Sequence, residues 1–139
     1  MYIINNMEGR LLMINKLNKI LGKYHVELKE GITANARFLS KNDLKKIAKL
    51  DKTILIDIFI EPSVADVLIF KEGIFVNALI TYKNETLFVH IEGIYIPLDL
   101  TYDRFNAIID GMCYRPPSRF YKVEEDGVYY LYCWWDKIW

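Results

Sequence analysis

The sequence contains no glutamine, only two cysteines and no long apolar run. A membrane helix needs about 20 predominantly apolar residues, and charged residues interrupt every candidate segment. The first residues, Met1-Tyr-Ile-Ile-Asn-Asn, also lack the basic start and the apolar stretch of a signal peptide. We therefore expect a cytoplasmic protein without membrane contact.

The sequence also lacks a metal-binding motif. Cys113 and Cys133 form no CxxC pair, so they predict neither a zinc site nor a disulfide framework, and we expect two reduced thiols in or near the core. His25 and His90 each fall on an expected strand without a second ligand nearby, which favours packing or hydrogen bonding. No metal ion and no cofactor are expected.

Neither sign of charge is in excess, because eighteen basic and eighteen acidic side chains cancel. Proteins that grip nucleic acid usually carry a basic excess, since neutralising phosphates supplies most of their affinity. Any binding of nucleic acid should therefore be weak, although a local basic patch stays open.

What is present is a large apolar content. A chain of 139 residues with 53% hydrophobic and 14% aromatic residues can bury a real core, so we expect one domain over residues 1–139. Nineteen isoleucines and thirteen lysines without glutamine are typical of a hyperthermophile, and an AT-rich genome produces much of the same bias. A virus or mobile element of a thermophilic archaeon is one hypothesis for the source.

Apolar spacing predicts three helices, over residues 9–21, 40–50 and 102–112. Gly22 suits the end of the first helix, and Ser40 begins the second in an arrangement that resembles a capping box. Strands are expected at 24–29, 53–60, 64–70, 74–82, 86–91, 94–97, 119–123 and 128–135. The expected fold class is α/β (α+β): one domain with a central mixed β-sheet and about three flanking helices.

Three segments share an order with a known family. Residues 9–29 place a helix that starts with glycine before a strand, residues 65–81 form a hairpin that begins Ala65-Asp66, and residues 93–134 add a strand, a helix and a closing hairpin. This order resembles the archaeal Holliday junction resolvases, members of the restriction-endonuclease-like PD-(D/E)xK nuclease fold. The resemblance implies that fold, a homodimer, and Asp66 at the family's aspartate.

In that family, acidic side chains hold magnesium, and a lysine orients the attacking water. The resemblance places Met13, Leu79 and Thr81 where the family has its other acids and its lysine. One carboxylate does not hold magnesium usefully against water, so we expect a degenerate site that does not cut DNA. A rearranged site is the alternative, with ligands from shifted positions: Glu8, Asp57 and Glu61 as acids and Lys83 as the lysine.

Each acid also has a structural interpretation. Asp66 follows a turn and could satisfy backbone groups at the start of a strand, which we favour over a metal role. Asp57 lies in the middle of the apolar strand 53–60, where a buried carboxylate is costly without a partner, so we expect it to pair with an Arg or Lys.

Aromatic residues crowd the last strand. Alternation sends Tyr130, Tyr132 and Trp134 to one face and Trp135, with Tyr129, Leu131 and Cys133, to the other. We predict an association surface at Tyr130, Tyr132, Trp134 and Trp135, because Tyr and Trp are favoured anchors of interfaces. The alternative is that these rings complete the core against the third helix.

The leading hypothesis is a non-catalytic protein with a nuclease-like fold that acts through protein contacts, as a homodimer or with another protein. The second is a metal-dependent nuclease or nucleic-acid-binding protein with a rearranged site. The third is an unrelated α+β domain.

Overall fold

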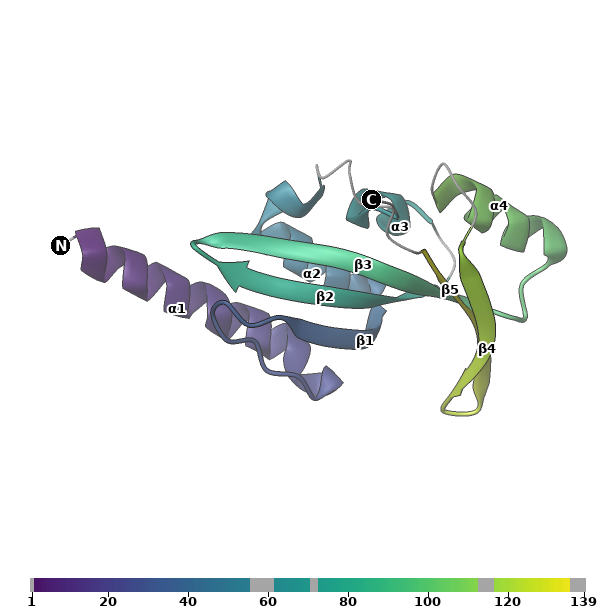
Figure 1. Ribbon diagram of the computed structural model, residues 1–139, viewed down its shortest axis with the longest axis horizontal. Helices are drawn as coiled ribbons and strands as arrows, with labels where there is room; N and C mark the ends of the chain where they lie inside the picture. The colour runs from purple at the N-terminus through teal and green to yellow at the C-terminus, as the bar shows by residue number, and fades with distance from the viewer. Residues whose placement is uncertain (1, 56–61, 71–72, 113–116, 136–139) are drawn as a thin grey trace.

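The computed structural model describes residues 2–55, 62–70, 73–112 and 117–135 (Figure 1). Their backbone forms four α-helices, two 3₁₀ helices and five strands. In chain order the elements are α1 (Tyr2–Leu21), η1 (Gly22–Tyr24), β1 (Ala34–Ser40), α2 (Lys41–Leu50), η2 (Lys52–Leu55), α3 (Val64–Leu68), β2 (Phe75–Lys83), β3 (Thr86–Pro97), α4 (Tyr102–Met112), β4 (Arg119–Glu125) and β5 (Val128–Trp134).

The five strands form one sheet in the order β1-β2-β3-β5-β4, and all its pairings are antiparallel. The predicted α+β class is confirmed, whereas the expected mixed sheet is wrong. Two-residue turns, Asn84-Glu85 and Asp126-Gly127, join β2 to β3 and β4 to β5. Such short connections join only antiparallel strands, because parallel neighbours need a crossover of a dozen or more residues.

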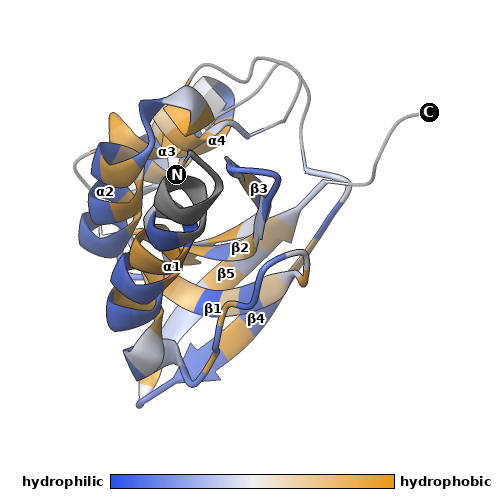
Figure 2. Ribbon diagram, turned by 90° about the vertical axis from the view of Figure 1, so that its left-hand side faces the viewer, coloured by the Kyte–Doolittle hydropathy of each residue, from blue (hydrophilic) through white to orange (hydrophobic). Residues whose placement is uncertain are grey.

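The α-helices lie against one face of the sheet (Figure 2). Each contributes to the main core on that face: Leu17 from α1, Leu44 from α2, Val67 from α3 and Ile108 from α4, packed with sheet residues such as Ile94. The other face, which we call the open face, carries no helix in the described part of the chain. The helices therefore cover one face of the sheet, and the open face is left to contacts other than helices.

The three predicted helices are confirmed. Residues 9–21 form the second half of α1, α2 begins after Ser40, and α4 spans the predicted residues 102–112. The Ser40 side chain accepts a hydrogen bond from the Asp43 N–H at 3.1 Å, as an N-cap should. None of the helices in the described residues has the length and apolar character needed to span a bilayer.

Two strand predictions are wrong, and a third is wrong in its first residues. Residues 24–29 form the end of η1 and irregular chain, and residues 64–70 contain helix α3. Ser63 starts α3 in a capping box, which explains why this apolar run is helical. Of the expected strand 53–60, Thr53 to Leu55 belong to η2, and the remainder lies outside the described residues.

The expected break between strands 86–91 and 94–97 is also wrong, because β3 is one continuous strand through Gly93. Its pairing with β2 is irregular between Asn77 and Ala78. The predicted closing hairpin is confirmed. In Figure 1, strand β4 lies at a steep angle to strand β2. The sheet thus bends enough for the hairpin to close over part of the open face.

Candidate functional site

The open face carries its own small core of rings, which we call the aromatic cluster: Tyr95, Tyr130 and Tyr132, with Phe38, Phe75, Val123 and Trp134 packed against them. Phe38 stacks on Tyr95 with ring centroids 3.8 Å apart, and the centroids of Tyr95 and Tyr132 are 4.6 Å apart. Strands from both halves of the sheet supply these rings, because Phe38 comes from the edge strand β1 and Tyr132 from β5, which lies beside the opposite edge strand β4. The cluster therefore holds the bent sheet closed without a helix.

A polar contact lies beneath this cluster. The Asn77 side chain donates a hydrogen bond through Nδ2 to the Tyr132 hydroxyl at 3.0 Å, and its Oδ1 has no partner among the described residues. The Tyr132 ring reaches Asn77 across Gly93 of the intervening strand. Burial is the main reason why the pKa of Tyr132 rises to about 12.

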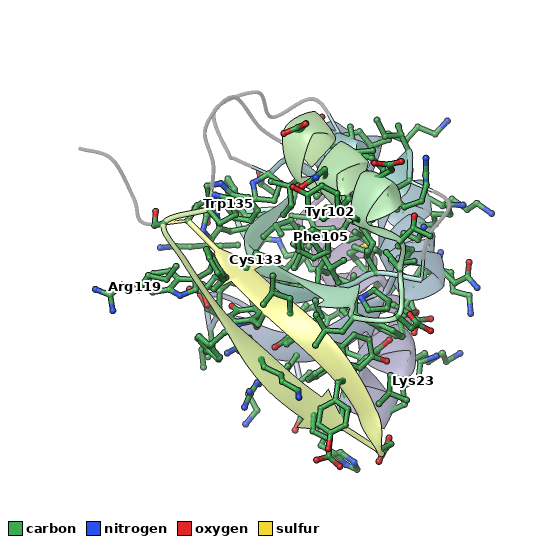
Figure 3. All side chains as sticks on the ribbon, turned by 90° about the vertical axis from the view of Figure 1, so that its right-hand side faces the viewer. Lys23, Tyr102, Phe105, Arg119, Cys133 and Trp135 are labelled. Carbon is green, nitrogen blue, oxygen red and sulfur yellow. The ribbon has the colours of Figure 1, made fainter. Side chains whose placement is uncertain are left out.

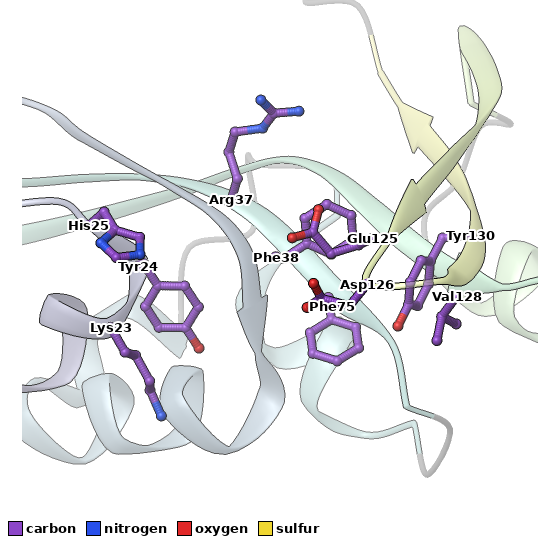
Figure 4. A pocket seen from close by; sticks show the side chains of 10 residues that line it. All are labelled: Lys23, Tyr24, His25, Arg37, Phe38, Phe75, Glu125, Asp126, Val128 and Tyr130. Carbon is purple, nitrogen blue, oxygen red and sulfur yellow. The ribbon is translucent and has the colours of Figure 1, made fainter.

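A groove of about 630 Å³, the charged groove, lies beside the cluster (Figure 4). Lys23, His25 and Arg37 line its basic side, and Glu125 and Asp126 from the β4–β5 turn line its acidic side. Aromatic and apolar side chains form the rest of its lining: Tyr24, Phe38, Phe75, Val128 and Tyr130. His25 is exposed with a left-handed φ of 60°, so the prediction that it lies on a strand is wrong.

Lys23 of this groove is also tied to a buried acid. Its Nζ lies 2.7 Å from Oδ2 of Asp43, and the Tyr24 hydroxyl donates to the same oxygen at 2.5 Å. Burial alone would raise the pKa of Asp43, but its hydrogen bonds with Lys23, Tyr24 and Ser40 outweigh burial and lower it. The sequence predicted a capping arrangement at Ser40 and did not reveal this network.

A second groove of about 520 Å³ lies on the open face near the start of β4. Arg119 lies over the Trp134 ring, 5.5 Å from its centroid, and extends away from the helices in Figure 3. The full lining is His90, Glu92, Arg119, Tyr121, Tyr132, Trp134 and Trp135. His90 lies on β3, as predicted for a strand residue.

Among the described residues, strand β4 forms one edge of the sheet and pairs with β5 alone. Six of its seven residues are exposed. Phe120 is 65% exposed and Tyr121 is 54% exposed, and strand alternation directs them to opposite faces. Two further large apolar residues of the hairpin, Val128 and Tyr129, are also exposed.

The candidate catalytic residues do not form a cluster within the described structure. Asp66 is in α3, where its carboxylate accepts from the Ser63 N–H at 3.3 Å. It therefore satisfies a backbone group, as predicted, but the prediction that this group starts a strand is wrong. Lys83 is exposed at the end of β2, beside a turn that lies well apart from α3 in Figure 1. Asp57 and Glu61 lie outside the described residues.

Other acids do not complete such a site either. Glu8 is exposed on α1, and no three His, Cys, Asp or Glu side chains of the described residues are placed to hold a metal ion. Of the positions that the resemblance assigns to the family's acids and lysine, Met13 packs against the core and Thr81 contacts Thr33 at 2.7 Å between their hydroxyl oxygens. Leu79 is half-buried on β2.

The predicted interface rings are mostly covered within the protomer. Tyr130, Tyr132 and Trp135 are buried, and Trp134 is half-buried. The predicted alternation is confirmed, because Tyr130, Tyr132 and Trp134 share the aromatic cluster whereas Trp135 joins the main core. The exposed rings of the closing hairpin are instead Phe120, Tyr121 and Tyr129, which sequence alternation could not separate from covered ones.

Cys133 is a free, buried cysteine, in agreement with the predicted thiol in the core. Burial raises the pKa of the Cys133 thiol to about 12, so it stays protonated and unreactive near neutral pH. Cys113 lies outside the described residues.

The fold and these surfaces define a class: an α+β protein with one helix-covered sheet face and an exposed edge hairpin. The chain matches no protein-family model, no curated protein and no solved structure. The relationship to the Holliday junction resolvases therefore stays a prediction.

Proposed function

We propose that this protein acts through protein–protein contacts and that strand β4 is its contact edge, with a second copy of the chain as the partner. The observation that carries the proposal is that β4 ends the sheet with six of its seven residues exposed. The exposed end strand of a sheet offers unpaired N–H and C=O groups to a strand of another chain.

The β4–β5 turn indicates which backbone groups of β4 are available. Asp126 and Gly127 have φ values of 51° and 80°, as in a two-residue type I′ turn. In such a turn the Glu125 carbonyl accepts from the Val128 N–H, so Glu125 directs its backbone groups towards β5. Backbone groups alternate along a strand, so those of Phe120, Lys122 and Glu124 point away from the sheet.

The opposite edge, β1, is less suitable for pairing. Its register with β2 shifts between Ala36 and Leu39, and Phe38 within it has a positive φ of 53°. A bulge of this kind bends a strand and interrupts its row of hydrogen-bonding groups. The β4–β5 pairing keeps one register from Arg119 to Glu125, so β4 supplies the more regular edge.

The exposed side chains favour the same surface. Phe120 and Tyr121 lie on β4, and Val128 and Tyr129 lie on β5 next to it. Phe120 and Tyr129 lie on one face of the hairpin and Tyr121 and Val128 on the other, so exposed apolar side chains border β4 on both faces. A paired strand would cover Phe120 on one face and Tyr121 on the other.

Sedimentation velocity over a concentration series tests the proposal. We expect the wild-type mass to rise towards that of two chains, and Lys122→Pro to weaken association on the order of tenfold, because proline removes an outward N–H. Lys122→Ala, which keeps the N–H, is the matched control for loss of the side chain. A mass of one chain at every concentration would contradict the proposal.

A further inference from the structure

The charges along β4 follow a direction. Arg119 and Lys122 lie in its first part, and Glu124 and Glu125 lie at its end. In an antiparallel pair of two copies, the basic part of one strand faces the acidic part of the other. The β4 edge is therefore complementary in charge to itself, which a parallel arrangement would not exploit.

The faces of the sheet restrict the register. A two-fold axis perpendicular to the sheet keeps the open faces of both copies on one side, and directly opposed residues share a side. Even-numbered residues of β4 must then oppose even-numbered residues, and odd must oppose odd. Each allowed register consequently places one residue of β4 opposite its own copy on the axis.

The charges of directly opposed side chains decide between the registers that place a central residue of β4 on the axis. With Lys122 or Glu124 on the axis, two like charges oppose each other directly, which destabilises a strand pair. With Tyr121 on the axis, Lys122 opposes the partner's Phe120, and no opposite charges meet. With Val123 on the axis, Lys122 opposes the partner's Glu124, and the symmetry repeats this pair.

We infer that β4 pairs antiparallel with β4 of a second copy, with Val123 opposite the partner's Val123 and Lys122 opposite the partner's Glu124. This inference rests on the proposed function and adds the partner's strand and its register. Lys122 and Glu124 carry outward-pointing backbone groups, so each such pair exchanges two backbone hydrogen bonds. Both sheets then form one continuous sheet through the dimer.

Cysteine cross-linking tests the register. The background variant is Cys113→Ser, which keeps only Cys133 of the natural thiols, and Cys133 is buried. Val123→Cys places two thiols at a non-hydrogen-bonded pair, where Cα atoms lie about 4.5 Å apart, within the range of a disulfide. We expect a disulfide-linked dimer under mild oxidation. Tyr121→Cys, two residues away on the same face, is the matched control. Its thiols would lie four residues apart along the strands, roughly 13 Å, and should not link.

Charge reversal tests the same pair without a covalent bond. Lys122→Glu and Glu124→Lys should each weaken dimerisation on the order of tenfold, because each places like charges opposite each other twice. The double variant restores opposite charges and should return the dissociation constant to near the wild-type value. Circular dichroism of all three variants checks that the fold is kept.

The outcomes separate the two proposals. A wild-type dimer that cross-links through Tyr121→Cys but not Val123→Cys would replace the inferred register with another one. A wild-type dimer in which neither links, or in which the double charge variant is weaker than both single variants, would overturn the pairing of β4 with β4. The Lys122→Pro variant would then decide whether β4 is still the contact edge of the dimer. A monomeric wild type would overturn the proposed function itself.

Discussion

The ring of Tyr132 lies across Gly93 so closely that a Cβ at Gly93 would be 2.5 Å from the Tyr132 hydroxyl oxygen. A side chain at Gly93 in the middle of β3 would therefore displace a ring of the aromatic cluster. The contact explains why a glycine lies within a strand, where it is otherwise unfavourable.

Gly93→Ala should therefore destabilise the fold. The added methyl group must displace the Tyr132 ring, and overpacking of this kind costs about 1–3 kcal/mol in the free energy of unfolding. Urea denaturation would measure the loss. Gly22→Ala is the matched control, since nothing lies within 4 Å of a Cβ there. It should leave stability unchanged or raise it by less than about 1 kcal/mol. Equal effects at both positions would contradict the contact.

Tyr132→Phe should also destabilise the protein, because the Asn77 Nδ2 group would lose its partner at 3.0 Å. A buried donor without a partner costs about 1–3 kcal/mol of unfolding free energy. Chemical denaturation measures the effect, with Tyr121→Phe as the control at a 54% exposed tyrosine. Combining Tyr132→Phe with Asn77→Ala should cost less than the sum of the single changes. Additive costs would mean that the two side chains are not coupled.

Asp43→Asn should reduce the free energy of unfolding by about 1–3 kcal/mol, because the buried carboxylate loses its charged hydrogen bonds with Lys23 and Tyr24. The folded pKa of Asp43 lies below its ordinary 3.8, so its contribution is present above that pH and is lost as pH falls below it. Denaturant titrations at neutral and acidic pH should show the difference from wild type shrinking. Asp103→Asn, at an exposed position, should change little. A difference that grows in acid would contradict the network.

Alkaline conditions should destabilise the protein. Burial raises the pKa of Tyr132 from 10.0 and that of Cys133 from 9.0, both to about 12. Between pH 9 and pH 12 the unfolded chain therefore binds fewer protons at these groups than the folded one, so stability falls as pH rises. Denaturant midpoints across this window would measure the slope, and Tyr132→Phe should make it shallower. A constant midpoint would argue against burial of these groups.

Local signals in the sequence predicted much of the secondary structure. The apolar spacing of Leu11, Ile14, Leu17 and Leu21 and the cap at Ser40 act within a few residues, so the helices could be found from the sequence. The Asp126-Gly127 turn likewise predicted the closing hairpin, since only a few residue types adopt its positive φ values.

The errors fall where local signals are ambiguous. Val64 to Phe70 is a short apolar run, which periodicity alone cannot assign to helix or strand, and the Ser63 cap decided for a helix. Val26 and Leu28 are more buried than their neighbours, as in a strand, but residues 26–28 pair with no strand in the described structure. A strand needs a partner, and its presence is not a local property.

The sequence by itself predicted the three longer helices, the closing hairpin and the two faces of β5. Only the tertiary structure decided which strand became the free edge and which rings were covered. Tyr130 and Phe120 are both aromatic strand residues, yet Tyr130 is buried and Phe120 is exposed. The difference arises because Tyr130 meets Phe38 and Phe75, which are distant in the sequence, whereas β4 has a neighbouring strand on one side alone in the part of the chain that the structure describes. Burial depends on neighbours in space, and the bend of the sheet sets those neighbours.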